Sequence, residues 1–325
     1  MTNRKTTWTC LLATALAALA TALAPGQTPA PQAEAPGIPQ AGFKIGVEVN
    51  MVNVPVTIRG ADGNFVRGLP RESFRLLEDG QPQEILFFAQ EGLPVHIAIV
   101  LDTSGSVRSE WGAIRYATRR FIEQLKPEDR FSLTTFNTEI RLKMDWGTET
   151  ARLGPVLTSI YCKDDTKVWD AVWVVSNDVF RGVEGKRVMI IMSDGLDNRS
   201  AVTFEEAVGA AVHEEVAVYV VSKTEALRQL VAALYREVPQ QQFANADLAL
   251  RKLAYETGGR VLYPNNFGQL DDIYADVDEE LRNQYTLGYV SSNTNKDGSY
   301  RRIDVGVARQ GVSVTARPGY YAPRD

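Results

Sequence analysis

The chain has 325 residues, of which 44% are hydrophobic and 23% are charged, and its formal net charge is −5. This composition is typical of a soluble globular protein, and a chain of this length can bury a core without disulfides or a structural metal. The negative net charge argues against sequence-independent nucleic-acid binding, which requires a basic surface. We therefore expect no nucleic-acid partner.

Residues 1–24 have the pattern of a signal peptide. Arg4 and Lys5 precede an uncharged apolar run over residues 8–20, and small-residue cleavage patterns follow at 18–20 and 22–24. This predicts a secreted or periplasmic protein, with a Pro/Ala-rich linker over residues 25–42. An uncleaved anchor is the alternative, because residues 8–24 reach the short limit of the roughly 17–25 residues that a membrane span requires. We expect no other membrane span.

Two segments with the pattern of antiparallel β structure flank the middle of the chain. In residues 43–92, apolar and polar positions alternate over 43–58, and further strands are predicted at 74–78 and 84–88, with Asp79-Gly80 as a tight turn. Residues 284–325 contain strand patterns at 285–290, 301–308 and 312–316. Neither segment is long enough to form its own core, so we expect the two to pair into a small β-sandwich.

Between these segments, over residues 93–283, strand and helix patterns alternate. The predicted strands are 96–101, 131–136, 140–144, 187–192, 216–221 and 260–263, and the predicted helices are 111–125, 153–161, 168–180, 203–214, 247–256 and 270–282. The continuously apolar run at 96–101 is typical of a strand that is buried on both faces. This alternation of strands and helices predicts an α/β domain with a mostly parallel sheet and helices on both faces. The glutamine run at 240–242 favours a loop.

Five oxygen-bearing side chains are predicted at one edge of this sheet, where ligands of open α/β folds bind. Asp102, Ser104 and Ser106 follow the strand at 96–101, Thr166 precedes the helix at 168–180, and Asp194 follows the strand at 187–192. Two carboxylates and three hydroxyls suit Mg²⁺, a hard cation that prefers six oxygen ligands at about 2.1 Å and keeps some waters. Mn²⁺ and Ca²⁺ are alternatives, whereas Zn²⁺ is disfavoured because neither histidines nor paired cysteines are nearby in sequence.

In residue type, order and position after strands, these five residues resemble the metal-ion-dependent adhesion site (MIDAS) of von Willebrand factor type A (VWA) domains. The resemblance covers roughly residues 95–283, and the flanking stretches 74–80 and 317–321 are similar to those of secreted bacterial VWA-related proteins. It implies a Rossmann-like, doubly wound fold and reversible adhesion to a protein whose Asp or Glu completes the metal shell. It also implies that Ser104 and Ser106 bind the metal directly, whereas Asp102, Thr166 and Asp194 exchange between direct and water-mediated contact.

Other functions have less support in the sequence. A hydrolase would need a general base, but the chain has neither a G-x-S-x-G nor an H-E-x-x-H motif, and no histidine lies near Ser104 in sequence. A structural subunit of an envelope complex with a degenerate site is a further alternative, disfavoured because all five ligand types are present. We therefore expect a binding protein without enzymatic activity.

Five further polar residues near the predicted ligands are interpreted separately. Asp170 fits a helix cap or a supporting acid better than a ligand. Asp197 and Asn198 are expected to be solvated loop residues, with a second cation site as the alternative. Asp164 and Asp165 stand where relatives often have glycine, and they predict either tighter cation binding or repulsion of an acidic partner.

Overall fold

The computed structural model describes residues 51–90, 94–163, 165–222 and 240–324. The predicted signal peptide, the linker and the first part of the strand predicted at 43–58 lie outside the described residues. No helix in the described part of the chain is long and apolar enough to cross a membrane.

A six-stranded sheet forms the centre of the α/β domain, with the strand order β10-β9-β8-β5-β6-β7. All neighbours in this sheet pair in parallel except β6 and β7, which are antiparallel. The strands are β5 (Val95–Asp102), β6 (Arg130–Phe136), β7 (Ile140–Gly147), β8 (Lys186–Ser193), β9 (Val216–Ser222) and β10 (Val261–Leu262). The predicted mostly parallel sheet is confirmed.

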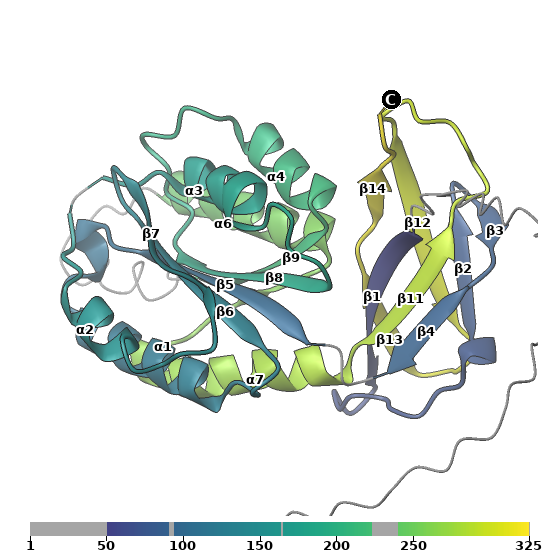
Figure 1. The fold of residues 1–325 in the computed structure, drawn as a ribbon, viewed down its shortest axis with the longest axis horizontal. Helices are drawn as coiled ribbons and strands as arrows, with labels where there is room; N and C mark the ends of the chain where they lie inside the picture. The colour runs from purple at the N-terminus through teal and green to yellow at the C-terminus, as the bar shows by residue number, and fades with distance from the viewer. Residues whose placement is uncertain (1–50, 91–93, 164, 223–239, 325) are drawn as a thin grey trace, which may run out of the picture. The chain divides into compact units, whose positions relative to one another are not determined.

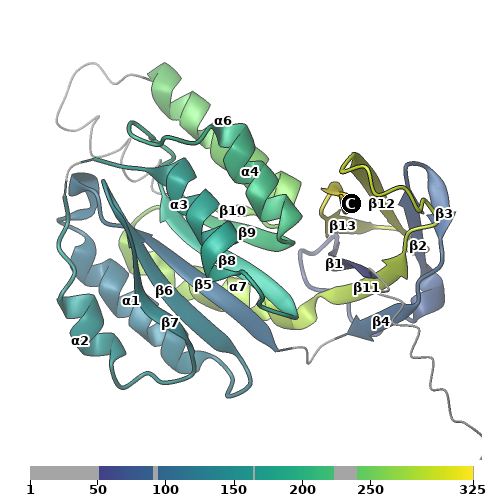
Figure 2. The ribbon, with the colours of Figure 1, turned by 45° about the horizontal axis from the view of Figure 1, so that its top comes forward.

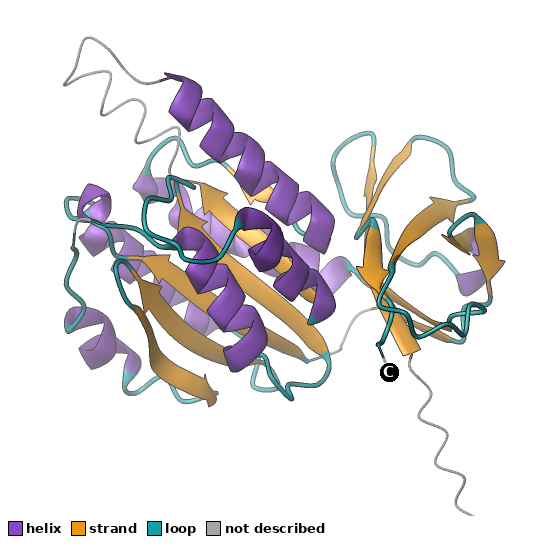
Figure 3. Ribbon diagram, turned by 90° about the horizontal axis from the view of Figure 1, so that it is seen from above, coloured by secondary structure: helices purple, strands orange, loops and turns teal. Residues whose placement is uncertain are grey.

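Helices cover both faces of this sheet, as Figures 1 and 3 show. One face packs against α1 (Trp111–Gln124), α2 (Leu153–Thr158) and α7 (Leu270–Asn283). The other packs against α3 (Val168–Val174), α4 (Phe204–His213) and α6 (Gln240–Thr257). The α/β fold class predicted from the sequence is therefore confirmed.

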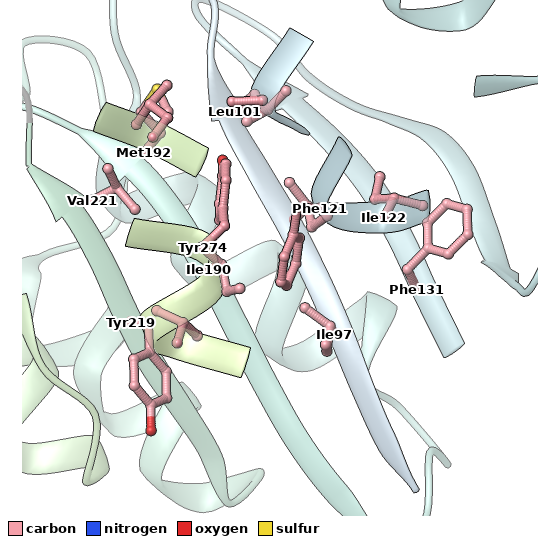
Figure 4. Close-up of a cluster of buried hydrophobic side chains, with 14 of the residues drawn as sticks. Ile97, Leu101, Phe121, Ile122, Phe131, Ile190, Met192, Tyr219, Val221 and Tyr274 are labelled. Carbon is pink, nitrogen blue, oxygen red and sulfur yellow. The ribbon is translucent and has the colours of Figure 1, made fainter. Parts of the chain in front are cut away.

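Each buried strand supplies side chains to two separate cores, because successive residues point to opposite faces. Ile97 and Leu101 of β5 lie in the core beneath α1 and α7, whereas Ala98 and Val100 lie in the opposite core. Figure 4 shows the first core, where Phe121 of α1 stacks on Tyr274 of α7 with 4.8 Å between ring centroids. The continuous apolar runs in the sequence are thus explained by burial on both faces.

The strands on either side of the α/β domain in sequence form two four-stranded sheets, visible in Figure 2. Their orders are β13-β1-β11-β4 and β14-β12-β2-β3. The strands are β1 (Met51–Gly60), β2 (Phe74–Glu78), β3 (Gln81–Gln83), β4 (Phe87–Gln90), β11 (Tyr285–Val290), β12 (Tyr300–Val307), β13 (Val312–Ala316) and β14 (Gly319–Tyr321). Each sheet contains strands from both ends of the described chain, and the two sheets share one apolar core.

A buried acid lies inside this sandwich. Glu78 of β2 is 2% exposed and accepts hydrogen bonds from the hydroxyls of Tyr289 (2.7 Å) and Tyr320 (2.9 Å). Its side chain also pairs with the equally buried Arg301 at 3.4 Å. Because these residues come from four strands, their polar contacts tie the two sheets together as well as satisfying the buried charge.

Several predicted boundaries differ from the observed ones. The strand predicted at 84–88 is β4, Phe87–Gln90, and the predicted helix at 168–180 is α-helical only to Val174 and then π-helical over Val175–Val179. The carbonyl of Val179 accepts a hydrogen bond from the indole of Trp146, which gives this last turn a partner outside the helix. The prediction of a loop at residues 240–242 is wrong. The α6 helix begins at Gln240, and glutamine has a favourable helix propensity.

The α/β domain is linked to the sandwich through Glu280 near the end of α7. The Glu280 carboxylate, 3% exposed, accepts hydrogen bonds from Thr57 of β1 (3.3 Å) and Tyr219 of β9 (3.1 Å). Arg59 and Arg260 donate to its second oxygen at 3.1 and 2.5 Å. Burial, and then the Glu280 charge, raise the pKa of Tyr219, so the phenol stays protonated as a donor.

We predict that Glu280→Ala lowers the free energy of unfolding by about 3 kcal/mol, the lower end of the range for breaking a buried ion pair, since both arginines retain access to water. Urea denaturation would measure the change. Glu279→Ala is the matched control: the adjacent Glu279 is exposed and lies 3.7 Å from the exposed Arg67, so its loss should cost about 0.5 kcal/mol or less. Equal effects of the two substitutions would contradict this account.

Candidate metal-binding site

The order of the strands places two of the predicted ligands side by side. After β5, the chain forms β6 and β7 on one side of β5, and then β8, β9 and β10 on its other side. The topological switch point therefore lies between β5 and β8. Leu101 pairs with Met192 in this register, which sets Asp102 beside Ser193 and one residue from Asp194. Both carboxylates therefore lie at the carboxyl edge, where open α/β sheets bind their ligands.

The loop after β5 turns its oxygens toward one another. Asp102 is fully buried, and its Oδ1 accepts a hydrogen bond from the backbone N–H of Ser104 at 2.7 Å. The hydroxyls of Ser104 and Ser106 lie 3.0 Å apart. Two hydroxyl oxygens at this separation, next to a carboxylate held by the backbone, form one side of an oxygen-lined site.

The loop after β8 requires a glycine. Asp194 is 4% exposed, and its Oδ1 accepts a hydrogen bond from the N–H of Leu196 at 3.0 Å. Gly195 has φ +73°, and an added Cβ would lie 2.9 Å from the side chain of Leu250 and 3.0 Å from the carbonyl of Ala246. Any other residue would be strained there and would collide with α6, so glycine keeps the Asp194 loop against the sheet edge.

Thr166 is held against the loop after β8 by hydrogen bonds. Its N–H donates to Oδ1 of Asn198 at 3.1 Å, and its carbonyl accepts from the N–H of Asn198 at 3.2 Å. In the same loop, the N–H of Lys163 donates to the carbonyl of Thr103 at 2.8 Å, beside Ser104. The segments that carry Asp102, Thr166 and Asp194 are therefore joined in one hydrogen-bonded arrangement.

Asp197 and Asn198 are more than the solvated loop residues predicted from sequence. Asp197 accepts hydrogen bonds from the N–H of Val168 at 3.0 Å and from the Ser200 hydroxyl at 2.9 Å, so it caps the start of α3. Asn198 clamps Thr166 from both sides, as described above. The sequence signal for such a role was that both residues lie close to Asp194. Their partners, Thr166 and Val168, lie about thirty residues earlier in the chain and come near them only in the folded protein.

Asp170 supports the same loop from the first turn of α3. One oxygen accepts from the N–H groups of Ala201 at 2.7 Å and Val202 at 3.0 Å, and the other accepts from Lys167 at 3.2 Å. Its carboxylate is thus engaged by the loop that follows Asp194, consistent with a supporting acid.

The donor set fits a hard divalent cation. Asp102 and Asp194 would balance the charge of the ion, and Ser104, Ser106 and Thr166 would add neutral oxygens. Within the described ranges, no group of three or more His, Cys, Asp and Glu side chains is placed to hold a metal, so a site here relies on hydroxyls beside two acids. Such a shell leaves the ion electrophilic toward a further anionic ligand.

The von Willebrand factor type A domain model matches residues 96–276, more than half of the chain. The chain belongs to the VWA domain family. This match runs from the second residue of β5 to the middle of α7 and therefore includes all five residues. No curated protein matches the chain.

Among solved structures, the chain is similar to an aerotolerance-related membrane protein from Bacteroides fragilis NCTC 9343 (15% identity, TM-score 0.44, 57% of this chain and 98% of that one). It is also similar to BatB from Bacteroides thetaiotaomicron (16% identity, TM-score 0.44, 57% and 98%). Proximal thread matrix protein 1 from the mussel byssus, with a zinc-occupied MIDAS motif, matches at 15% identity and TM-score 0.46, over 63% of this chain and 49% of that one.

We predict that Asn198→Ala weakens divalent-metal binding by about 10–100-fold, the range for losing a residue that orients a ligand. The substitution removes the side chain that accepts from the Thr166 N–H but leaves all five oxygen donors in place. Isothermal titration with MgCl₂ and MnCl₂ would measure the affinity. Asn177→Ala, at a half-buried position on the π-helical turn after α3, is the control and should bind like the unaltered protein. An unchanged affinity for Asn198→Ala would show that the Thr166 clamp does not matter.

Proposed function

We propose that this VWA protein is exported to the periplasm or cell exterior and binds a protein partner through a divalent cation, with Mg²⁺ favoured. Asp102, Ser104, Ser106, Thr166 and Asp194 hold the cation, and a carboxylate of the partner completes its shell. The metal supplies an electrophilic contact point, while the protein residues fix its position at the sheet edge.

One observation carries this proposal: Asp102 ends β5 and Asp194 directly follows β8, the two strands that flank the switch point, and the Ser104 and Ser106 hydroxyls lie in the loop after Asp102. A divalent cation beside these two buried carboxylates would balance their charge. Backbone hydrogen bonds already hold each carboxylate, so the protein need not reorganise to receive the ion.

The surrounding charges favour an acidic partner. Asp165, which could repel a carboxylate, forms an ion pair with Arg199 at 3.3 Å and lies 3.4 Å from the amide of Asn198. Arg108 lies at the same edge, where it donates to the carbonyl of Cys162 at 3.2 Å, and Lys163 is exposed beside it. The basic side chains around the loops would therefore attract an acidic surface.

Neither histidine of the described residues is placed to act as a general base for hydrolysis. His96 lies at the start of β5, six residues before Asp102, which is about 20 Å along an extended strand. His213 is exposed at the end of α4, beside Glu214. Both acids would be occupied by the metal, so we expect binding without turnover.

We predict that Asp102→Asn abolishes measurable Mg²⁺ and Mn²⁺ binding while leaving the thermal unfolding temperature of the metal-free protein within a few degrees. The amide keeps the size of the side chain and an acceptor for the Ser104 N–H but loses the charge. Calorimetric titration measures binding, and Asp178→Asn, an exposed acid paired with Arg181, is the control. Unchanged affinity in Asp102→Asn would refute the ligand assignment.

We also predict that partner capture from envelope extracts requires both the metal and partner carboxylates. Capture should occur with Mg²⁺, fail with chelator or with Asp102→Asn, and fail when the eluted partner is rebound after carbodiimide and ethanolamine have blocked its carboxylates. Capture that survives the blocking would contradict the carboxylate contact. Metal-dependent hydrolysis of ester or phosphodiester substrates, lost in Asp194→Ala, would instead support the hydrolase alternative.

A further inference from the structure

A cavity lies at the opposite end of the sheet from the metal edge. It has a volume of about 440 Å³, within the range of about 300–1,000 Å³ that small-molecule sites occupy. The amino ends of β5, β8 and β9 form one wall, and β1, β4 and β11 of the sandwich contribute the other. Phe87, Pro94 and Ala217 supply apolar surface to it.

Cationic side chains line this cavity, and some of their N–H groups have no hydrogen-bond partner among the described residues. Arg317 is 4% exposed; it donates from one nitrogen to the Asn53 carbonyl (2.8 Å) and to Glu215 (2.7 Å). Its Nε and its other terminal nitrogen are buried and have no hydrogen-bond partner among the described residues. The same is true of Nε of Arg187, whose Nη1 donates to the carbonyl of Glu214 at 2.6 Å and lies 3.5 Å from the Glu214 carboxylate.

Two further nitrogen-bearing side chains, Lys186 and His96, line the wall. Lys186 donates to the carbonyl of Leu281 at 2.7 Å, and burial, followed by the nearby Arg282, lowers its pKa to about 7. His96 has a buried Nδ1 without a partner in the described structure, and burial lowers its pKa too. Glu184 and Glu215 also line the cavity, so it carries both signs, but Glu215 is already engaged by Arg317.

We propose that this cavity binds a small organic acid, a carboxylate or sulfonate with an apolar body, whose anionic group accepts hydrogen bonds from Arg187 and Arg317. Buried donors without acceptors destabilise a folded protein, and an anionic group supplies acceptors that form strong, charge-assisted bonds. The apolar part of the ligand would lie against Phe87, Pro94 and Ala217. Because its walls come from both the α/β domain and the sandwich, a bound acid would contact both.

A pair of fluorescent probes tests this proposal on the protein as it exists. Anilinonaphthalene sulfonate has an anionic group on an aromatic body, and phenylnaphthylamine has a similar body without the charge. We expect the sulfonate to bind with one site per chain, in the presence or absence of chelator, and the uncharged probe to bind more weakly. Chelator insensitivity separates this site from the proposed metal site.

Two substitutions test separately the contribution of the arginine charge and that of the cavity volume. Arg187→Gln should weaken the sulfonate by about tenfold or more, as expected for losing hydrogen bonds to a charged group, and leave the uncharged probe unchanged. Ala217→Leu fills the cavity and should weaken both probes. Arg181→Gln, an exposed arginine on the loop before β8, is the control. Thermal unfolding monitors folding of each variant, and Arg187→Gln alone decides the question if Ala217→Leu is unstable.

Two results would overturn the proposal. Sulfonate binding that is unaffected by Arg187→Gln would show that the arginine does not hold the anion. Absence of one-site binding by the sulfonate, with a series of short aromatic and branched-chain carboxylates also failing to protect the protein against thermal unfolding, would show that the cavity holds only water.

Discussion

The parallel pairing of β5 with β8 is the constraint on which the rest of the structure depends. It creates the switch point, brings Asp102 beside the residues around Asp194, and buries both strands between two layers of helices. The apolar core on each face keeps the register, because a slip of one residue would turn Ile97 and Leu101 toward the wrong core. The position of the two carboxylates at the carboxyl edge of the sheet is thus set by the packing of hydrocarbon side chains beneath them.

Buried acids are used in three ways in this protein. Glu78 joins the two sheets of the sandwich, Glu280 joins α7 to β1 and β9, and Asp170 holds the loop that follows Asp194. Each has several donors around it, which offset the cost of removing a charge from water. Asp102 and Asp194 also accept backbone hydrogen bonds, but their place at the carboxyl edge suits them to a cation.

The two proposed sites lie at opposite ends of the same strands. The carboxyl ends of β5 and β8 carry acids and hydroxyls, whereas their amino ends carry His96, Lys186 and Arg187. The chemistry at the two ends is therefore complementary in sign: one suits a cation and the other an organic anion. The α7 helix connects the sheet to the sandwich through Glu280, and the sandwich closes the cavity.

The sequence by itself determined the α/β class, because apolar runs such as residues 96–101 are local signals, and it predicted the five oxygen donors that the family motif marks. It did not reveal the roles of Asp197 and Asn198, since their partners Val168 and Thr166 are distant in the chain. The π-helical turn after Val174 depends on packing that no local pattern encodes. Only the tertiary structure decided which loops hold Thr166 and that Arg187 and Arg317 share a cavity, because these contacts join segments that meet only when the sheet and sandwich have formed.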